Sequence, residues 1–387
     1  MQDIIRTLLD KGVRIPCPEA VSVDNIPPER ICARATLYPG TCLSGPDTFI
    51  GEDTVIGQGG GALIQNCQIG KGCTLMQGVY RDSTMLDGFN ARHGAELRDN
   101  CLLEEDVSLG HTVGLKQTVF MTHVVAGSLI NFCDALLCGG RSRKDHSEIG
   151  SCMALYNFTP QGDKFASYFG DVRTGVFLDD DAIFIGGQTQ IVSPVHVGFG
   201  SVIAAGTKLS HSVSDHTFVT GCDAPLRQKE NSSVIRRASE KTATTLGYIQ
   251  QLQALKTWYQ YVRQPALSGI SHYDILLPAA LRRLDAAIAE RVARLERFAK
   301  RLANNTPTDA QTCTDHAQAR AMIKNALNAI ANFHENIDLN ALQSIAEDIH
   351  AAVQTGLSYP EAIHSISDKH KSVTWFSSHS ADSYDYR

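Results

Sequence analysis

The sequence predicts a mainly β fold, in which a three-sided coil of parallel strands over residues 31–222 is followed by an α-helical domain over residues 223–387. Two observations predict it. Aliphatic residues recur at every sixth position from 185 to 209, with small residues filling much of the space between them. After about residue 220 the composition changes from Gly and β-branched residues to Ala, Leu, Gln, Arg and Glu.

The six-residue period is the main evidence for the coil. It fits neither an amphipathic helix, which repeats every 3.6 residues, nor an alternating strand, which repeats every 2. It fits a prism in which each hexad forms one flat face and its aliphatic residue points inward, so that stacked turns bury a continuous ladder. An antiparallel β-sandwich is the alternative. The inward residues are Ile185, Ile191, Val197, Ile203 and Leu209.

The same period is found earlier in the chain, with interruptions. Single-residue slips in its register predict small bulges at the corners of the prism. Longer lapses at 80–92 and 138–182 predict loops that leave the coil. The expected inward residues are Ile31, Leu37, Leu43, Ile50, Ile56, Leu63, Ile69, Leu75, Leu97, Leu103, Leu109 and Leu115.

Residues 1–30 are expected to cap the coil, because a terminal turn otherwise exposes its apolar cross-section. They begin with a short amphipathic helix that ends near Asp10. In the C-terminal domain, apolar residues recur at three- and four-residue steps among strong helix formers. This pattern predicts helices over 244–263, 279–302, 316–333 and 339–355.

Composition excludes several classes of protein. The net charge of −6 provides no overall positive field for nucleic acid, and the apolar runs are too short to span a bilayer. The eleven cysteines are scattered and contain no CxxC pair. We therefore expect buried thiols in a reducing cytoplasm. We expect no metal, because only His211 and His216 have the spacing of a zinc site between subunits.

A flat-sided prism has no cleft of its own, so we expect binding sites between the subunits of a homotrimer. His123 lies in an apolar stretch and could accept a proton as a general base. A histidine with only a structural role is the alternative. Arg92 and Lys116 could each bind a phosphate, or could simply face solvent.

Two interruptions of the coil also carry polar groups. The loop from Cys138 to Ser147 begins with glycines and is basic, which suits a diphosphate; its cations are Arg141, Arg143 and Lys144. The break from Tyr156 to Lys164 offers the Asn157 amide with the charge of Lys164 close by. The alternatives are a solvated loop for the first and a structural bulge for the second.

Three stretches resemble a known family: Ala91–Leu97, Val113–Gln117 and Phe184–Thr207. From about residue 88 to 213 the chain resembles the left-handed parallel β-helix of hexapeptide-repeat acyltransferases. The most similar is the acetyltransferase domain of the bifunctional N-acetylglucosamine-1-phosphate uridyltransferase/glucosamine-1-phosphate acetyltransferases. The whole chain is similar to proteins labelled UDP-N-acetylglucosamine pyrophosphorylase-like.

The resemblance implies roles for individual residues. Arg92 and Lys116 would bind the sugar phosphate, His123 would be the general base, and Asn157 would orient the amine. Gly187 and the backbone around Ala204 and Ala205 would line the acyl-CoA groove. The chain departs from the family pattern in four ways: it is about one hexad shorter between Lys116 and His123, it is about eleven residues longer between His123 and Asn157, Phe158 replaces a tyrosine, and Gly187 replaces a serine.

The expected function is therefore transfer of an acyl group, most simply acetyl, from acetyl-CoA or another acyl-CoA. The acceptor would be a phosphorylated or nucleotide-linked amino sugar, bound between subunits of the trimer. The alternative is a non-catalytic sugar-nucleotide-binding or scaffold protein of the same fold. We expect no pyrophosphorylase activity from this chain, because the roughly 30 residues before the coil are too few for a βαβ nucleotide-binding domain.

Overall fold

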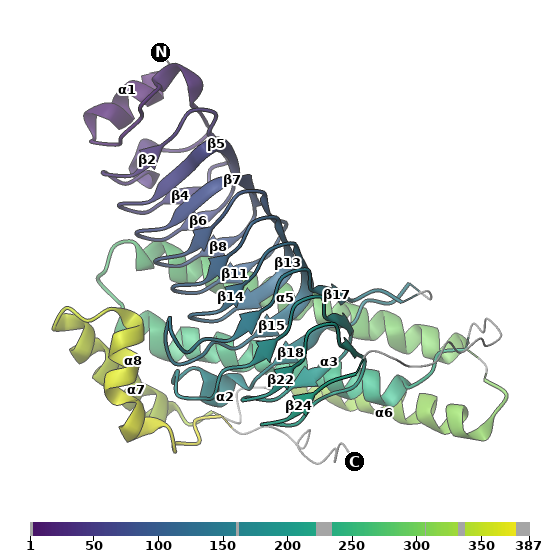
Figure 1. Ribbon diagram of the computed structural model, residues 1–387. Coiled ribbons are helices and arrows are strands. Elements are labelled where there is room, and N and C mark those ends of the chain that lie inside the picture. The colour runs from purple at the N-terminus through teal and green to yellow at the C-terminus, as the bar shows by residue number, and fades with distance from the viewer. Residues whose placement is uncertain (1–2, 160–161, 222–233, 306, 332–336, 377–387) are drawn as a thin grey trace.

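The computed structural model describes residues 3–159, 162–221, 234–305, 307–331 and 337–376. It confirms the predicted fold class. A left-handed parallel β-helix runs from the N-terminal helix down to residue 219, and a bundle of α-helices lies along its lower part (Figure 1). Among the described residues, no helix has the length and apolar character that a membrane crossing requires.

The β-helix has three faces, which we call A, B and C in the order in which the chain passes through each turn. Face A consists of β4 (Phe49–Ile50), β6 (Gln68–Ile69), β8 (Thr84–Met85), β11 (Leu102–Leu103), the ends of β13 (Val113–Phe120) and β15 (Ile130–Leu137), β18 (Ser167–Phe169) and β21 (His196–Val197). Face B consists of β2 (Thr36–Leu37), the starts of β5 (Val55–Gln65) and β7 (Thr74–Arg81), β9 (Asn90–Ala91), β12 (Ser108–Leu109), β14 (Val125–Ala126), β16 (Glu148–Ile149), β19 (Phe184–Ile185), β22 (Val202–Ile203) and β24 (Phe218–Val219). Face C consists of β1 (Ser22–Asp24), β3 (Cys42–Ser44), the remaining parts of β5, β7, β13 and β15, β10 (Ala95–Leu97), β17 (Ala154–Tyr156), β20 (Gln190–Val192) and β23 (Lys208–Leu209).

The corners between faces, which we call AB, BC and CA, are tight turns. Many of them contain a residue with positive φ, such as Asp106 (62°) and His123 (71°) at corner AB and Leu129 (59°) at corner BC. The left-handed conformation disfavours most side chains, and Asp and His tolerate it better than bulky residues do. The structure therefore gives His123 a role in turning the chain.

The structure corrects two expectations about the residues that point into the coil. Leu63 is 38% exposed and Ile64 is fully buried in its place, because a glycine-rich bulge at 57–61 shifts the register of β5 against β7. The predicted loop at 80–92 is wrong, since β7, β8 and β9 continue the coil there. The inward residues of this stretch are Tyr80, Met85 and Ala91, and a search for aliphatic side chains at six-residue steps does not detect them.

The lapse at 138–182 is a set of excursions separated by strands. The chain leaves the coil at 139–147, at 157–159 and 162–166, and at 170–183, and the last excursion contains the short helix α2 (Val172–Gly175). Between these excursions β16, β17 and β18 pair in parallel with the strands above and below. Loops thus leave the prism at corners AB and CA, near its lower end.

Helix α1 (Asp3–Asp10) lies over the first turn and buries Ile5 and Leu8 (Figure 1). Parallel pairing already begins with β1, whose Val23 lies beside Leu43 of β3. The C-terminal helices are α3 (Ala238–Trp258), which continues through η3 (Tyr259–Arg263) into α4 (Gln264–Ala266), and then α5 (Tyr273–Asn304), α6 (Ala310–Ala331), α7 (Leu339–Gln354) and α8 (Tyr359–His370). The four predicted helices correspond to α3 with η3, α5, α6 and α7, although residues 332–333 of the third prediction lie outside the described residues; the sequence missed α8.

The helices close face A. Helix α3 and its continuation η3 run along this face. Gln251 of α3 accepts a hydrogen bond from Val172 N, and Tyr259 Oη of η3 donates one to Glu104 (2.8 Å). Helix α5 returns along corner CA, where Arg283 contacts Gln68 and Arg291 pairs with Asp134. The outward side chains of face A are therefore buried, including Gln68, Thr84, Leu102, Val119 and Leu136.

Faces B and C remain open. Within the β-helix, the exposed large hydrophobic side chains of the described residues lie on these faces or on the corners that border face C. They are Leu63, Leu129, Tyr156, Phe158, Phe184, Val192, Val202 and Phe218.

Candidate functional site

The residues predicted for the site lie at three different corners of the prism. Corner BC carries Arg92, Gly187, Ala204 and Ala205. Corner CA carries Lys116, Asn157 and Lys164, and corner AB carries His123, Arg141, Arg143 and Lys144. A single copy of the chain therefore brings them together only in part.

At corner AB the structure joins two of the predicted residues through a carboxylate. Arg143 forms an ion pair with Asp106, and His123 Nδ1 lies 3.5 Å from the other oxygen of Asp106. His123 Nδ1 is buried and forms no hydrogen bond with the described residues. Lys144 is exposed and Arg141 turns away toward Asp181.

His123 is only 5% exposed. Burial lowers the pKa of its imidazole to about 4, and His364, Arg143 and His146 add to this, whereas Asp106 opposes it. An imidazole that stays neutral can accept a proton, but the burial of His123 separates it from any amine in solvent.

The buried His123 makes stability depend on pH. Its pKa is lower in the folded chain than the usual value of 6.5, so between pH 6.5 and 4 the unfolded chain binds more protons at this position. The free energy of unfolding should therefore fall as the pH is lowered from 6.5 to 4. Urea unfolding at several pH values measures this, and His123→Asn should show a smaller fall than wild type; an unchanged slope would contradict the buried, neutral imidazole.

Corner CA holds its predicted residues mainly in contacts within the chain. Asn157 Nδ2 donates to Asp134, whose other oxygen pairs with Arg291 of α5. Lys164 lies in the same loop, where its backbone bridges to Phe158. Lys116 is partly exposed and lies 3.7 Å from Asp99. Lys116 and Lys164 are both partly exposed, so either could reach a phosphate.

Corner BC is open to solvent along its length. Arg92 is exposed, and His111 lies on the next turn with its Nδ1 atom 2.7 Å from Ser128 Oγ. Below them, Ser151 Oγ accepts a hydrogen bond from Ser128 N (3.1 Å), followed by Gly187 and Ala205. The sequence analysis did not single out the exposed His111–Ser128 pair, because the two residues are joined only by the stacking of successive turns.

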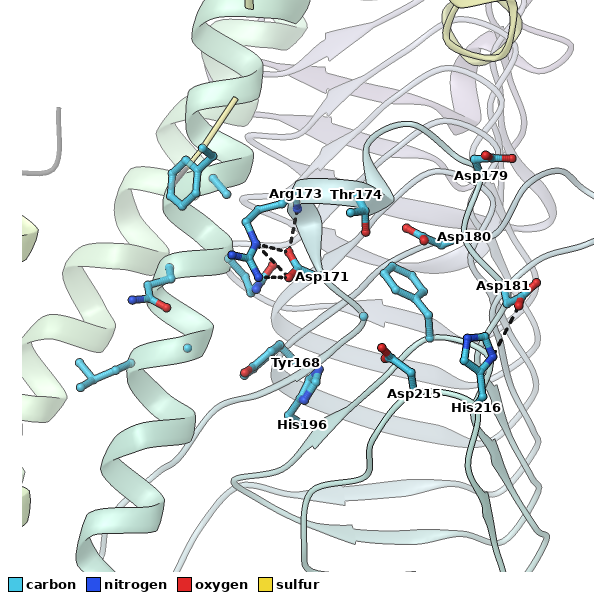
Figure 2. Close-up of a pocket in the computed structure, with 18 of the residues that line it drawn as sticks. Tyr168, Asp171, Arg173, Thr174, Asp179, Asp180, Asp181, His196, Asp215 and His216 are labelled. Atoms are coloured by element: carbon cyan, nitrogen blue, oxygen red, sulfur yellow. Dashed lines mark hydrogen bonds and ion pairs between the residues drawn. The ribbon is translucent and has the colours of Figure 1, made fainter. Parts of the chain in front are cut away.

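The structure also contains a cavity of about 590 Å³ near the lower end of face A. It lies between the 170–183 excursion, the last turns of the coil and α3 (Figure 2). Of the predicted residues only Arg141 lines it. Its polar lining includes Asp171, Arg173, Asp179, Asp180, Asp181, His196, Asp215 and His216. The run Asp179–Asp181 is visible in the sequence, but nothing there indicates that it meets His196 and Asp215.

No three His, Cys, Asp or Glu side chains in the part of the chain that the structure describes come together in a way that could hold a metal ion. His211 contacts Arg237, whereas His216 lies 3.6 Å from Asp181.

Comparison with known proteins supports the resemblance seen in the sequence. The chain is 28% identical over 212 residues to the bifunctional protein GlmU of Geobacillus sp. (strain WCH70), covering 55% of this chain and 41% of that protein. It is 31% identical over 214 residues to GlmU of Pelobacter propionicus, and 26% over 242 residues to GlmU of Ralstonia nicotianae, of which it covers 41% and 48%. The chain therefore spans less than half the length of these relatives. No family model matches it.

Proposed function

We propose, from the GlmU-like left-handed β-helix of this chain, that the protein is an acyl-CoA-dependent acyltransferase acting on a phosphorylated or nucleotide-linked amino sugar. The observation that carries the proposal is the similarity to GlmU proteins over more than half of the chain. The open corner BC, with Arg92 above and Gly187, Ala204 and Ala205 below, supports it as the place where sugar phosphate and acyl-CoA meet. Acetyl-CoA is the simplest donor.

The reaction needs a base. The amine of the sugar attacks the thioester carbonyl and an imidazole takes the proton that the amine loses. The carbon–sulfur bond then breaks, and the imidazolium returns this proton to the departing sulfur, so that CoA leaves as the thiol. His123 is the candidate from the sequence, but it is buried beside Asp106, so the residues that cover it must first move. His111 is exposed at corner BC and needs no such movement.

A homotrimer would complete the site. Since α3 and α5 cover face A, a second copy can pack only against faces B and C, where the exposed hydrophobic side chains gather. Such packing would bring residues from neighbouring copies to one site. Binding both substrates between copies supplies rate by proximity. The ten described cysteines are all free thiols, which supports a reducing cytoplasm as the compartment.

The test measures release of CoA thiol from acetyl-CoA in the presence of amino sugar 1-phosphates, amino sugar 6-phosphates and UDP-amino sugars. We expect turnover with at least one acceptor, and a loss of about 10²–10⁴-fold in kcat when the base is replaced. His123→Ala and His111→Ala are compared, with the exposed His93→Ala as the matched control. No turnover with any acceptor would contradict the proposal.

Binding without catalysis is the second candidate, and the burial of His123 favours it. Ligands that bind only the folded state raise the melting temperature. A rise with UDP-sugars but not with CoA, together with no thiol release, would identify a sugar-nucleotide-binding or scaffold protein. The absence of pyrophosphorylase activity stays a prediction.

A further inference from the structure

The cavity at the lower end of face A has a lining unlike that of a site for phosphate or CoA. Its walls come from separate parts of the chain: Tyr168 and His196 on face A, residues 170–181 of the excursion, Asp215 at corner AB, and residues 243–254 of α3. Figure 2 shows the carboxylates of Asp180 and Asp215 turned toward the space between the excursion and α3. A volume of about 590 Å³ lies within the usual range for small-molecule sites.

Three of its carboxylates are neutralised within the protein. Asp171 is held by Arg173, with Nε 3.0 Å from Oδ2. Asp181 pairs with Arg141 at 2.7 Å, and Asp179 pairs with Lys371 at 3.0 Å. Both arginines that line the cavity, Arg141 and Arg173, thus pair with its carboxylates.

Asp180 and Asp215 have no cationic partner among the residues that the structure describes. The Oδ2 atom of Asp180 is inaccessible to solvent and has no hydrogen-bond partner there. Burial and the neighbouring carboxylates of Asp171, Asp179 and Asp215 raise the pKa of Asp180, whereas a hydrogen bond with Thr174 lowers it. A buried charged oxygen without a partner is costly, so Asp180, with the exposed carboxylate of Asp215 near it, marks a position that a positive charge would stabilise.

The rest of the lining suits an organic ligand. The rings of Tyr168 and His196 are stacked, with centroids 4.4 Å apart, and Phe199, Ala243 and Leu246 add apolar surface. Aromatic faces attract ammonium groups, and the apolar surface suits a hydrocarbon chain. A sugar phosphate or CoA is anionic and would be repelled by the unpaired carboxylates.

We propose that this cavity binds a small organic cation, an aliphatic ammonium compound, with Asp180 and Asp215 receiving its charge. The site is separate from corner BC, and the proposal does not depend on acyl transfer. Its ligand is recognised by positive charge together with a short apolar body.

The experiment titrates the full chain with 1,4-diaminobutane by calorimetry, at neutral pH and low salt. The matched neutral probe is 1,4-butanediol, which has the same length and no charge, and inorganic phosphate is the anionic probe. We expect saturable binding of one diamine per chain, and none of butanediol or phosphate. Binding that is absent at millimolar diamine, or equally strong for butanediol, would overturn the proposal.

Variants locate the binding. Asp180→Asn and Asp215→Asn should each raise the dissociation constant of the diamine at least about tenfold, as expected when a charge–charge contact worth about 1.4 kcal/mol is lost. Asp10→Asn is the control, because it removes one exposed carboxylate at the far end of the molecule. It should leave the dissociation constant unchanged, and an equal loss in this control would overturn the proposal.

A third variant, which changes no charge, shows whether weaker binding comes from the cavity itself rather than from misfolding. Ala243→Leu narrows the cavity from the side of α3 without changing any charge. It should weaken diamine binding while the melting temperature stays close to that of wild type. Undiminished binding in Ala243→Leu, Asp180→Asn and Asp215→Asn alike would place the diamine elsewhere and overturn the assignment.

Discussion

Replacing Arg263 with methionine is expected to lower the free energy of unfolding by about 3–5 kcal/mol, the usual result of removing one partner from a buried ion pair. Arg263 is 1% exposed and contacts both Glu104, at 3.2 Å, and Glu105. Its guanidinium also lies 3.9 Å from the centre of the Tyr359 ring of α8. The substitution would leave two buried carboxylates of the coil without their cation.

The chemistry of this cluster also predicts how the loss depends on pH. Burial, opposed by Arg263, raises the pKa of Glu105 to about 7. A carboxyl whose pKa is raised in the folded state binds its proton more tightly there than in the unfolded chain. At low pH the carboxyl is protonated and carries no charge in the folded chain, so it destabilises the fold least under those conditions. The destabilisation by Arg263→Met should therefore be smaller at pH 5 than at pH 8.

Urea unfolding followed by circular dichroism measures the effect. Arg282→Met is the matched control, since Arg282 is exposed on α5, and it should change stability by less than about 0.5 kcal/mol. Adding Glu105→Gln to the Arg263→Met variant should restore part of the loss, because it removes one unpaired charge. A loss no greater than that of the control would contradict the view that this cluster fastens the helices to face A.

Truncating Ile191 to alanine is expected to cost about 2–5 kcal/mol, the range found for large-to-small changes in protein cores. Ile191 is fully buried on the inward side of β20, between Leu155 above and Leu209 below. The prism can collapse little around the resulting cavity, because its turns are tied to one another by the parallel ladders.

The neighbouring Gln190 provides the control. It lies on the same strand and points outward, so Gln190→Ala should change the free energy of unfolding by less than about 0.5 kcal/mol. Equal effects of the two substitutions in urea unfolding would contradict the register of face C. A larger effect for Gln190 would reverse the inward and outward sides of the strand.

The fold could be predicted because its signal is local and repeated. Ile185, Ile191, Val197, Ile203 and Leu209 lie at one spacing, and the structure places all five inside the coil. The period was lost at 80–92 because Tyr80 and Ala91 fill rungs there, a large side chain on one face and a small one on another. A search for aliphatic residues at six-residue steps does not detect rungs of this kind.

The contacts of the helical domain could not be predicted in the same way. Arg263 reaches Glu104 across 159 residues of sequence, and neither residue has a periodic pattern that points to the other. The burial of His123 follows from the same packing at corner AB. His111 and Ser128 are brought together by one turn of the coil, which the sequence could have indicated once the register was known.

Acyl transfer by this protein can be followed as transfer of labelled acetyl from acetyl-CoA to an amino sugar phosphate, detected as the mass of the acetylated sugar. We expect an N-acetylated product that carries the label and forms in proportion to the thiol released. Release of thiol without labelled sugar, or no labelled product from any phosphorylated or nucleotide-linked amino sugar, would contradict this expectation.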